Sequence, residues 1–181
     1  MSQVVIVSGP PGAGKSSVCR ALCERYDRTV HLETDDVYAW IRMGYMAPWK
    51  PGSARQNLMV SRAAARAATA FVREGFGVFI DGVIGPAHLP VYLEELRSAG
   101  VPVHFVLLLP PLDEIKRRAK GREKQVAGAE EMFARVYRMF ADEPRFAGCT
   151  VDSTGLTADQ TADRVMAACG AGECLVLDPD P

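Results

Sequence analysis

The chain has 181 residues, of which 48% are hydrophobic and 24% are charged, values typical of a globular protein with one substantial core. The formal net charge of −1 provides no basic field that would recruit nucleic acid. No apolar run approaches the length of a membrane span, so no membrane partner is expected. The five cysteines show no paired C-x-x-C spacing, which predicts reduced thiols and a cytoplasmic setting.

Predicted strands and helices alternate along the chain. Apolar runs with β-branched residues predict strands over residues 4–7, 29–33, 77–81, 101–109 and 148–152, three of which end in an acidic residue. Apolar residues at helical spacing predict helices over residues 15–26, 37–42, 53–74, 89–98, 112–120, 129–140 and 157–169. Ser53 and Thr157 are predicted N-caps, and Gly75 is the predicted stop of the longest helix. This alternation predicts one α/β domain, residues 1–181, with a five-stranded parallel sheet covered by helices on both faces.

The first loop matches the phosphate-binding pattern G-x-x-x-x-G-K-[ST] at every fixed position. It lies between a predicted strand and a predicted helix, as this motif requires. Its glycines let main-chain N–H groups point at phosphate oxygens, and the helix adds the positive end of its dipole. We predict that Lys15 reaches the β- and γ-phosphates of ATP and that Ser16 holds Mg²⁺. The predicted nucleotide-binding residues of this segment are Gly9, Pro10, Pro11, Gly12, Ala13, Gly14, Lys15, Ser16 and Ser17.

Carboxylates follow two predicted strands, at the end of the sheet that also carries the phosphate loop. Asp35 can accept the proton of an attacking hydroxyl or hold Mg²⁺ through water; we favour the role of general base. Asp36 is expected to cap the helix that starts at Val37 or to support Asp35. Asp81 ends an apolar strand, as a Walker B carboxylate does, which predicts a role at Mg²⁺ beside Ser16. A carboxylate in a solvated loop is the alternative for Asp81.

A dense run of positive charge follows the fourth predicted strand, at residues 116–124. We predict that it belongs to a lid over residues 116–128 that covers the phosphates. Guanidinium groups bind phosphoryl oxygens with a two-pronged geometry that lysine cannot provide. Arg118 and Arg122 are therefore the predicted catalytic residues of the lid, acting with Lys15. A charge run is also typical of a solvated helix face, and we apply that interpretation to the other cations.

Aromatic and cationic side chains mix on an irregular stretch inside the predicted acceptor segment, residues 37–74. Such a mixture suits a substrate pocket. Trp40 and Ile41 are expected to pack against the core instead. The predicted acceptor-binding residues are Asp35, Tyr38, Arg42, Trp49 and Arg55.

Other features limit the range of functions. The three histidines show no metal-site spacing, and His31 and His104 are predicted sheet residues. A GTPase normally carries an Asn-Lys-x-Asp motif, and none is present, which favours ATP. The polar tail, residues 171–181, is expected to be loosely held.

In these motifs the chain resembles the P-loop small-molecule kinases, which include shikimate and gluconate kinases, and more closely the chloramphenicol phosphotransferases. The resemblance implies a three-layer P-loop NTPase fold of the nucleoside monophosphate kinase type. It also implies that Asp35 is the general base and that the basic stretch is an arginine-bearing lid. By the same resemblance, Asp152 and Thr154 lie near the adenine. Residues 43–55 have no counterpart in that family, so the acceptor stays open.

The predicted function is transfer of the ATP γ-phosphate to a hydroxyl of a small molecule, a metabolite or an antibiotic. Two alternatives remain. One is a regulatory P-loop ATPase that acts on a protein partner, and the other is a kinase of nucleotide or nucleic-acid ends. Neither the acceptor nor the oligomeric state follows from the sequence.

Overall fold

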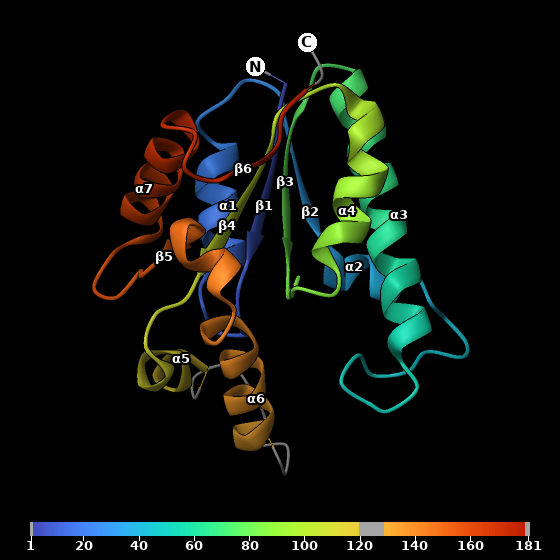
Figure 1. Cartoon of the computed structure of the whole chain (residues 1–181), viewed down its shortest axis with the longest axis vertical. Coiled ribbons are helices and arrows are strands. Elements are labelled where there is room, and N and C mark those ends of the chain that lie inside the picture. Colours follow the sequence, from blue (N-terminus) through green and yellow to red (C-terminus); the bar gives the residue numbers. More distant parts are fainter. Residues whose placement is uncertain (1, 120–128, 180–181) are drawn as a thin grey trace.

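The computed structural model describes residues 2–119 and 129–179. Five parallel strands form one sheet in the order β2-β3-β1-β4-β5, with β1 between β3 and β4 (Figure 1). The strands are β1 (Val4–Ser8), β2 (Thr29–Glu33), β3 (Gly77–Gly82), β4 (Val103–Leu108) and β5 (Thr150–Val151). The five-stranded parallel sheet predicted from the alternation of elements is confirmed.

Helices cover both faces of this sheet. They are α1 (Lys15–Cys23), α2 (Thr34–Ala39), α3 (Ala54–Arg73), α4 (Leu89–Leu96), α5 (Leu112–Ala119), α6 (Ala129–Ala141) and α7 (Ala158–Gly170), with 3₁₀ turns at Arg97–Ala99 and Pro144–Cys149. The helices α1 and α7 lie together on one face, and α3 and α4 lie together on the other (Figure 1). Within the described residues, no helix is long and apolar enough to cross a membrane.

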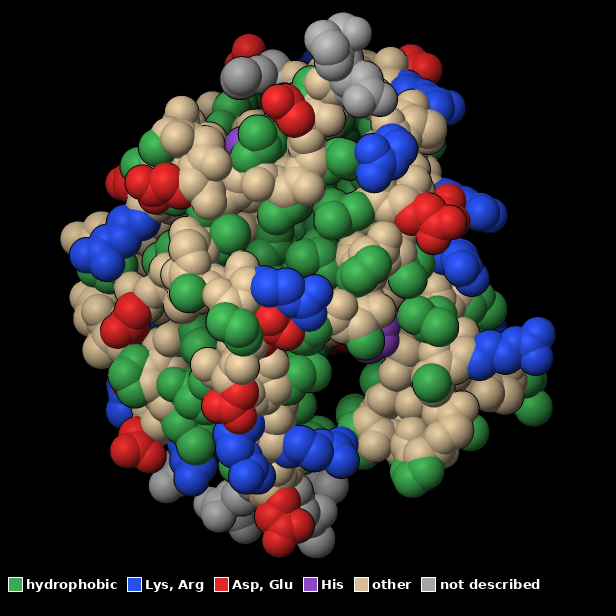
Figure 2. All heavy atoms as spheres, viewed as in Figure 1, with side chains coloured by type: hydrophobic (Ala, Val, Ile, Leu, Met, Phe, Trp, Pro, Cys, Tyr) green, Lys and Arg blue, Asp and Glu red, His purple; other side chains and the backbone are tan. Residues whose placement is uncertain are grey.

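The carboxyl ends of the strands face an open side of the molecule. Beyond this end, α5 and α6 project on one side, and residues 40–53, which connect α2 to α3, project on the other (Figure 1). The space-filling view shows an open hollow between these two projections (Figure 2). Ligands of open parallel sheets bind outside the carboxyl ends of the strands. A functional site is therefore expected in this hollow.

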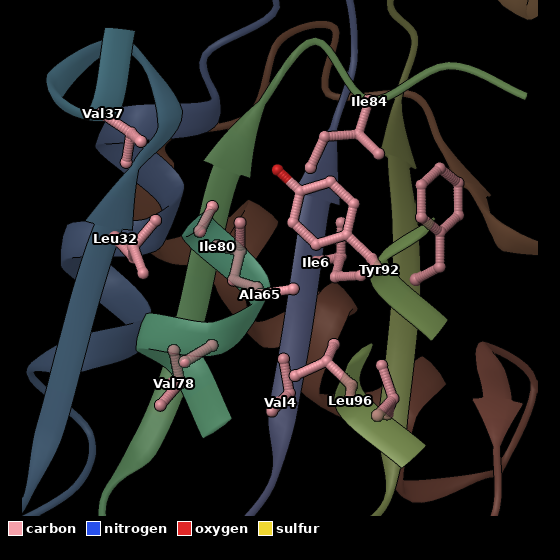
Figure 3. Packing of buried hydrophobic residues seen from close by; sticks show 14 of the residues in the cluster. Val4, Ile6, Leu32, Val37, Ala65, Val78, Ile80, Ile84, Tyr92 and Leu96 are labelled. Atoms are coloured by element: carbon pink, nitrogen blue, oxygen red, sulfur yellow. The ribbon is translucent and has the colours of Figure 1, made fainter. Parts of the chain in front are cut away.

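The central strand shows why both faces of the sheet are covered. Val4 and Ile6 belong to a buried cluster with residues of α3 and α4, whereas Val5 and Val7 belong to a second cluster with residues of α1 and α7. Successive side chains of a strand point to opposite faces, so an uninterrupted apolar strand needs helices on both sides. Figure 3 shows the first cluster, with Tyr92 of α4 among the strand residues.

Local predictions at helix ends had mixed outcomes. Thr157 caps α7 in a capping box with Gln160, as predicted, and Gly75 follows α3 with a φ of 83°. Ser53 is at the N-cap position of α3, as predicted, but its side chain makes no capping hydrogen bond: its backbone is already helical, and its hydroxyl donates to the carbonyl of Pro48 at 2.7 Å. The first helix is shorter than predicted and ends at Cys23.

The C-terminal region is more ordered than the sequence suggested. Leu175–Leu177 forms a sixth strand, β6, which pairs antiparallel with β4 near Val103 and His104. The amide of Phe105 donates to the carbonyl of Cys174 at 2.8 Å, and Cys174 is buried. The expectation of a loose tail is therefore wrong for these residues.

Candidate nucleotide-binding and phosphoryl-transfer site

The phosphate loop joins β1 to α1, and its shape depends on glycine. Gly9, Gly12 and Gly14 have φ angles of 147°, 85° and 98°, a region that residues with a side chain rarely adopt. A methyl group at Gly9 would overlap the main-chain carbonyl of Leu108. The glycines are therefore required by the backbone itself, and α1 begins at Lys15 as predicted.

The loop presents several amides that the fold does not use. Within the described structure, the N–H groups of Gly12, Gly14, Lys15 and Ser16 donate no main-chain hydrogen bond. They lie at the N-terminus of α1, where the helix dipole favours negative charge. Adjacent free donors at a helix N-terminus fit the oxygens of a polyphosphate. The residues present in this loop thus fit the triphosphate of ATP.

Lys15 lies over the loop with only 9% of its surface exposed. Its ammonium donates to the carbonyl of Pro10 at 3.2 Å. Burial lowers the pKa of Lys15 below its usual range, while the carboxylates of Asp81 and Asp35 partly counter this effect. The ammonium therefore lies in a dry position, within electrostatic reach of both predicted carboxylates.

Asp81 lies at the carboxyl end of β3, with 5% of its surface exposed. Burial raises the pKa of Asp81, but the imidazole of His31, the charge of Lys15 and the hydroxyl of Ser16 together bring it below its ordinary value. The Ser16 hydroxyl and the Asp81 carboxylate thus lie side by side. Oxygen ligands of this kind are the ones that Mg²⁺ prefers, so these residues fit a magnesium site.

His31 belongs to this site, although the sequence marked it only as a sheet residue. Its Nε2 lies 3.5 Å from Oδ2 of Asp81, and its Nδ1 lies 3.6 Å from Oε1 of Glu33. The ligand atoms of the three residues lie within 4.8 Å of one another. Glu33 and Asp81 are direct partners in the β2–β3 register, so the grouping follows from the strand order.

The predicted general base lies at the start of α2, which begins earlier than expected. Because α2 starts at Thr34, Asp35 and Asp36 are in its first turn, and Asp36 is not its N-cap; acidic side chains are favoured there by the helix dipole. Asp35 is exposed, and its charge reaches Lys15. Thr34 is buried against Gly82, where a methyl group would overlap its side chain. Gly82 therefore lets α2 begin close to the end of β3.

A hydrogen-bonded network connects α2 to the irregular segment and to α3. The phenol of Tyr38 donates to Oδ1 of Asn57 at 3.0 Å, and Nδ2 of Asn57 donates to the carbonyl of Pro48 at 2.9 Å. Nδ2 also donates to the Ser53 hydroxyl at 3.2 Å. Burial, with a further contribution from the Asp35 carboxylate, raises the pKa of Tyr38 to about 12. Asn57 was not among the predicted site residues, yet it fixes Tyr38 beside Asp35.

The remaining predicted acceptor residues are exposed. Arg42 and Arg55 lie on the surface, and Trp49 has 55% of its surface exposed. Trp40 is 64% exposed, so its expected packing against the core is wrong, whereas Ile41 does pack against the core. The backbone of Trp40 still continues the helical turn, because its amide donates to the carbonyl of Asp36. Trp40 therefore lies on the side of the exposed Asp36, whereas Ile41 lies on the side of the buried Val37.

Arg118 lies beside the phosphate loop, as predicted for the first lid arginine. Its guanidinium donates to Glu114 at 2.7 Å, to the carbonyl of Ala13 at 3.3 Å, and to the hydroxyl and carbonyl of Ser153 at 3.1 and 3.0 Å. It thus connects α5, the phosphate loop and the loop after β5. The other predicted lid arginine, Arg122, lies outside the described residues.

The loop after β5 is a tight polar turn. Oδ1 of Asp152 accepts from the amide and the hydroxyl of Thr154 at 2.8 and 2.6 Å, while Ser153 between them is buried. The contact of Ser153 with Arg118 places this turn next to the phosphate loop. Proximity of Asp152 and Thr154 to the adenine of ATP stays a prediction.

Fold and site together define a P-loop nucleotide-binding domain with the architecture of small-molecule kinases. Residues 4–140 match the AAA_33 family, described as an AAA domain, and the chain belongs to this family. Solved structures confirm, for the fold, the resemblance to P-loop small-molecule kinases.

The fold is similar to that of an unliganded sugar kinase from Janibacter sp. HTCC2649, with a TM-score of 0.72, 20% identity, and coverage of 92% of this chain and 94% of that chain. A gluconokinase from Sinorhizobium meliloti 1021 gives a TM-score of 0.70 at 16% identity, covering 95% and 94%. The tunicamycin resistance protein of Deinococcus radiodurans gives 0.66 at 23% identity, covering 98% and 99%. At these identities the likeness concerns the fold.

Proposed function

We propose that this protein is an ATP-dependent kinase that transfers the γ-phosphate to a hydroxyl of a small molecule. One observation carries the proposal: the buried ammonium of Lys15 lies within electrostatic reach of two carboxylates that differ in exposure. Asp81 is buried beside Ser16, as a magnesium ligand would be. Asp35 is exposed, as a base that must meet an incoming alcohol has to be.

In the proposed reaction, the free amides of the phosphate loop and Lys15 bind and orient the triphosphate. The acceptor oxygen attacks the γ-phosphorus and its proton passes to the Asp35 carboxylate, while the bond from the γ-phosphorus to the bridging oxygen breaks and ADP leaves. Ser16 and Asp81 would hold Mg²⁺, which supplies charge neutralisation of the phosphate oxygens when bound. Lys15 neutralises charge on the same oxygens.

We further propose that the chain acts as a single kinase domain, with residues 37–74 binding the acceptor and residues 116–128 forming a lid. The contacts of Arg118 with Ala13 and Ser153 support a lid that starts beside the nucleotide. A lid would exclude water, which otherwise competes with the acceptor for the phosphoryl group.

The replacement Asp35→Asn tests the base. Without a carboxylate to accept the proton, turnover should fall by about 10²- to 10⁴-fold, while the dissociation constant for ATP stays nearly unchanged. The assay follows ADP formation over a panel of hydroxyl-bearing metabolites and antibiotics, with the phosphorylated product identified by mass.

Asp36→Asn is the matched control, because Asp36 is an exposed carboxylate in the same helical turn. It should retain activity. Equal transfer by both variants would remove Asp35 from the mechanism. Hydrolysis of ATP without any acceptor, stimulated by a protein partner, would instead favour a regulatory ATPase, and salt-sensitive binding to oligonucleotides would favour an end kinase.

A further inference from the structure

The acceptor segment is strongly cationic, although the whole chain is nearly neutral. From Val37 to Arg73 the sequence contains six arginine and lysine residues and no aspartate or glutamate. The three arginines further along α3 have partners. Arg62 and Arg66 pair with Glu95 of α4, and Arg73 donates to the carbonyl of Ser98. The other three cations of the segment have no such partners in the part of the chain that the structure describes. They are Arg42 and Lys50, within the connection of residues 40–53 that borders the hollow, and Arg55, in the first turn of α3.

These three cations have no carboxylate partner within residues 2–119 and 129–179. They appear in none of the ion pairs of that part of the structure, and their side chains donate no hydrogen bond there. Exposed cations that have no ion-pair partner favour an anionic ligand. A partner for these cations is therefore expected to come from outside the chain.

The same segment exposes most of the large apolar side chains on the described surface. Ten such residues are substantially exposed, and six of them fall between residues 40 and 59. The six are Trp40, Met43, Tyr45, Met46, Trp49 and Met59. Exposed apolar side chains that gather in one place mark binding surfaces, whereas scattered ones need no explanation.

The exposure is not a consequence of a loose loop. Gln56 of α3 holds the main chain of Met46 with two hydrogen bonds, to its amide at 2.8 Å and to its carbonyl at 2.6 Å. Asn57 and Ser53 both bind the carbonyl of Pro48. The backbone is thus anchored to α3 while its tryptophans stay exposed. A preorganised surface of this kind loses little conformational entropy when a ligand binds.

The surface also adjoins the reacting groups. Tyr45 lies close enough to Tyr38 to affect its ionisation, and Tyr38 is in turn affected by Asp35. Tyr38 is fixed in that place by Asn57. A ligand lying on the exposed segment can therefore present a hydroxyl to the predicted base.

We infer that the acceptor is a small alcohol that carries both a planar apolar group and an anionic group. The apolar group lies on the tryptophan and tyrosine side chains of residues 40–49, and the anionic group pairs with Arg42 or Arg55. This inference rests on the proposed kinase function, since it names the class of its acceptor. Aromatic faces bind planar groups by stacking, and arginine binds carboxylate or phosphate through two parallel hydrogen bonds.

The two tryptophans of the chain provide a direct readout, because Trp40 and Trp49 are the only ones and both lie on this segment. We would titrate the protein, saturated with a non-hydrolysable ATP analogue and Mg²⁺, with four primary alcohols. They are 4-(hydroxymethyl)benzoate, which has ring and charge; benzyl alcohol, which has only the ring; glycerate, which has only the charge; and glycerol, which has neither. Tryptophan fluorescence reports binding.

The expected result is that 4-(hydroxymethyl)benzoate binds at least about tenfold more tightly than either single-feature alcohol, and glycerol most weakly. Replacing both arginines, Arg42→Gln with Arg55→Gln, should reduce binding of the benzoate to the level of benzyl alcohol and leave benzyl alcohol unaffected. Arg73→Gln is the matched control, because it removes a cation from the far end of the same helix. It should change neither affinity.

Three results would overturn the inference: equal affinity for all four alcohols, no fluorescence change with any of them, or a preference for glycerate or glycerol. A salt-sensitive response to an oligonucleotide with no response to the benzoate would also overturn it. Failure of the kinase proposal would look different. In that case the same order of affinities would persist, but no alcohol, tested with ATP in place of the analogue, would gain a phosphate.

Discussion

The two walls of the hollow are built by different means. On the nucleotide side, the main chain forms the site. Glycines with positive φ place free amides at the start of α1, and a methyl group at Gly9 would overlap the carbonyl of Leu108. On the acceptor side, the main chain is irregular, and side chains of α3 such as Asn57 and Gln56 hold it in place. The residues of the first wall, 9–17, are buried or half-buried, whereas the second wall exposes tryptophans.

This difference predicts which amino-acid substitutions each wall tolerates. A site made of main-chain amides accepts one ligand chemistry, because its donors cannot be exchanged by substitution. A wall made of exposed side chains on an anchored loop can change its ligand by replacing those side chains, while the anchors keep the loop in place. We therefore expect changes on the nucleotide side to abolish activity and changes on the acceptor side to alter preference.

The largest expected effect concerns Lys15. Lys15→Ala removes a buried charge from the phosphate loop, and phosphoryl transfer should fall by about a thousandfold. The measurement is single-turnover transfer at saturating ATP, with circular dichroism to verify folding. Transfer within a factor of a few of wild type would mean that the two walls do not differ as described.

Gly82 connects the two walls, since it lets Thr34 pack at the end of β3. Gly82→Ala should destabilise the protein by about 1–3 kcal/mol through overpacking, because the new methyl would overlap the Thr34 side chain. It should also lower turnover by displacing the first turn of α2, which carries Asp35. Urea unfolding gives the stability, and the double variant Gly82→Ala with Thr34→Ala, which lacks both the hydroxyl and the γ-methyl that the new methyl would overlap, should recover part of it.

Asn57 tests the anchoring of the acceptor wall. Asn57→Ala leaves the Tyr38 phenol without its partner and removes one of the two donors to the Pro48 carbonyl, which keeps the Ser53 hydroxyl; the cost is about 1–3 kcal/mol of stability. The KM for the acceptor should rise by about tenfold, whereas the KM for ATP should not change. Gln56→Ala is the milder control, because it frees only the exposed main-chain groups of Met46. A rise in the KM for ATP would contradict the separation of the walls.

The smallest effect is expected at Glu114, which binds Arg118 beside the phosphate loop. Hydrogen bonds from Arg117 and Arg118 lower the pKa of Glu114 to about 2 from an ordinary 4.5. A depressed carboxyl pKa stabilises the folded state above the unfolded value, and this contribution is lost as pH falls from about 4.5 towards 2. Glu114→Gln should therefore melt below wild type at neutral pH, with a gap that closes on acidification. A gap independent of pH would exclude this ion pair as its cause.

The nucleotide side could be predicted from the sequence because its information is local. Glycines at fixed spacing, a strand before them and a helix after them specify Lys15 and Ser16 without knowledge of the rest of the chain. Asp81 was predicted for a similar reason, since a strand-end carboxylate must face the same edge of the sheet. Arg118 required only the position of its helix after β4.

What the sequence did not reveal depends on contacts between distant segments. His31 joins Asp81 only because β2 neighbours β3, and strand order is not visible in a residue pattern. Asn57 looks like an ordinary helix residue until Pro48 folds back onto it. Trp40 is a large aromatic residue next to Ile41, which packs against the core, and its exposure follows from its place one helical turn after the exposed Asp36.

The sixth strand covers part of an edge of the sheet that would otherwise be exposed. One edge of β4 is shared by two short strands, with β5 along Leu107 and Leu108 and β6 along Val103 and His104. Deleting the final residues would bare main-chain donors and acceptors on half of that edge. Uncovered edges act as templates for strands of other molecules, so truncated versions should self-associate, and fusion partners belong at the amino end.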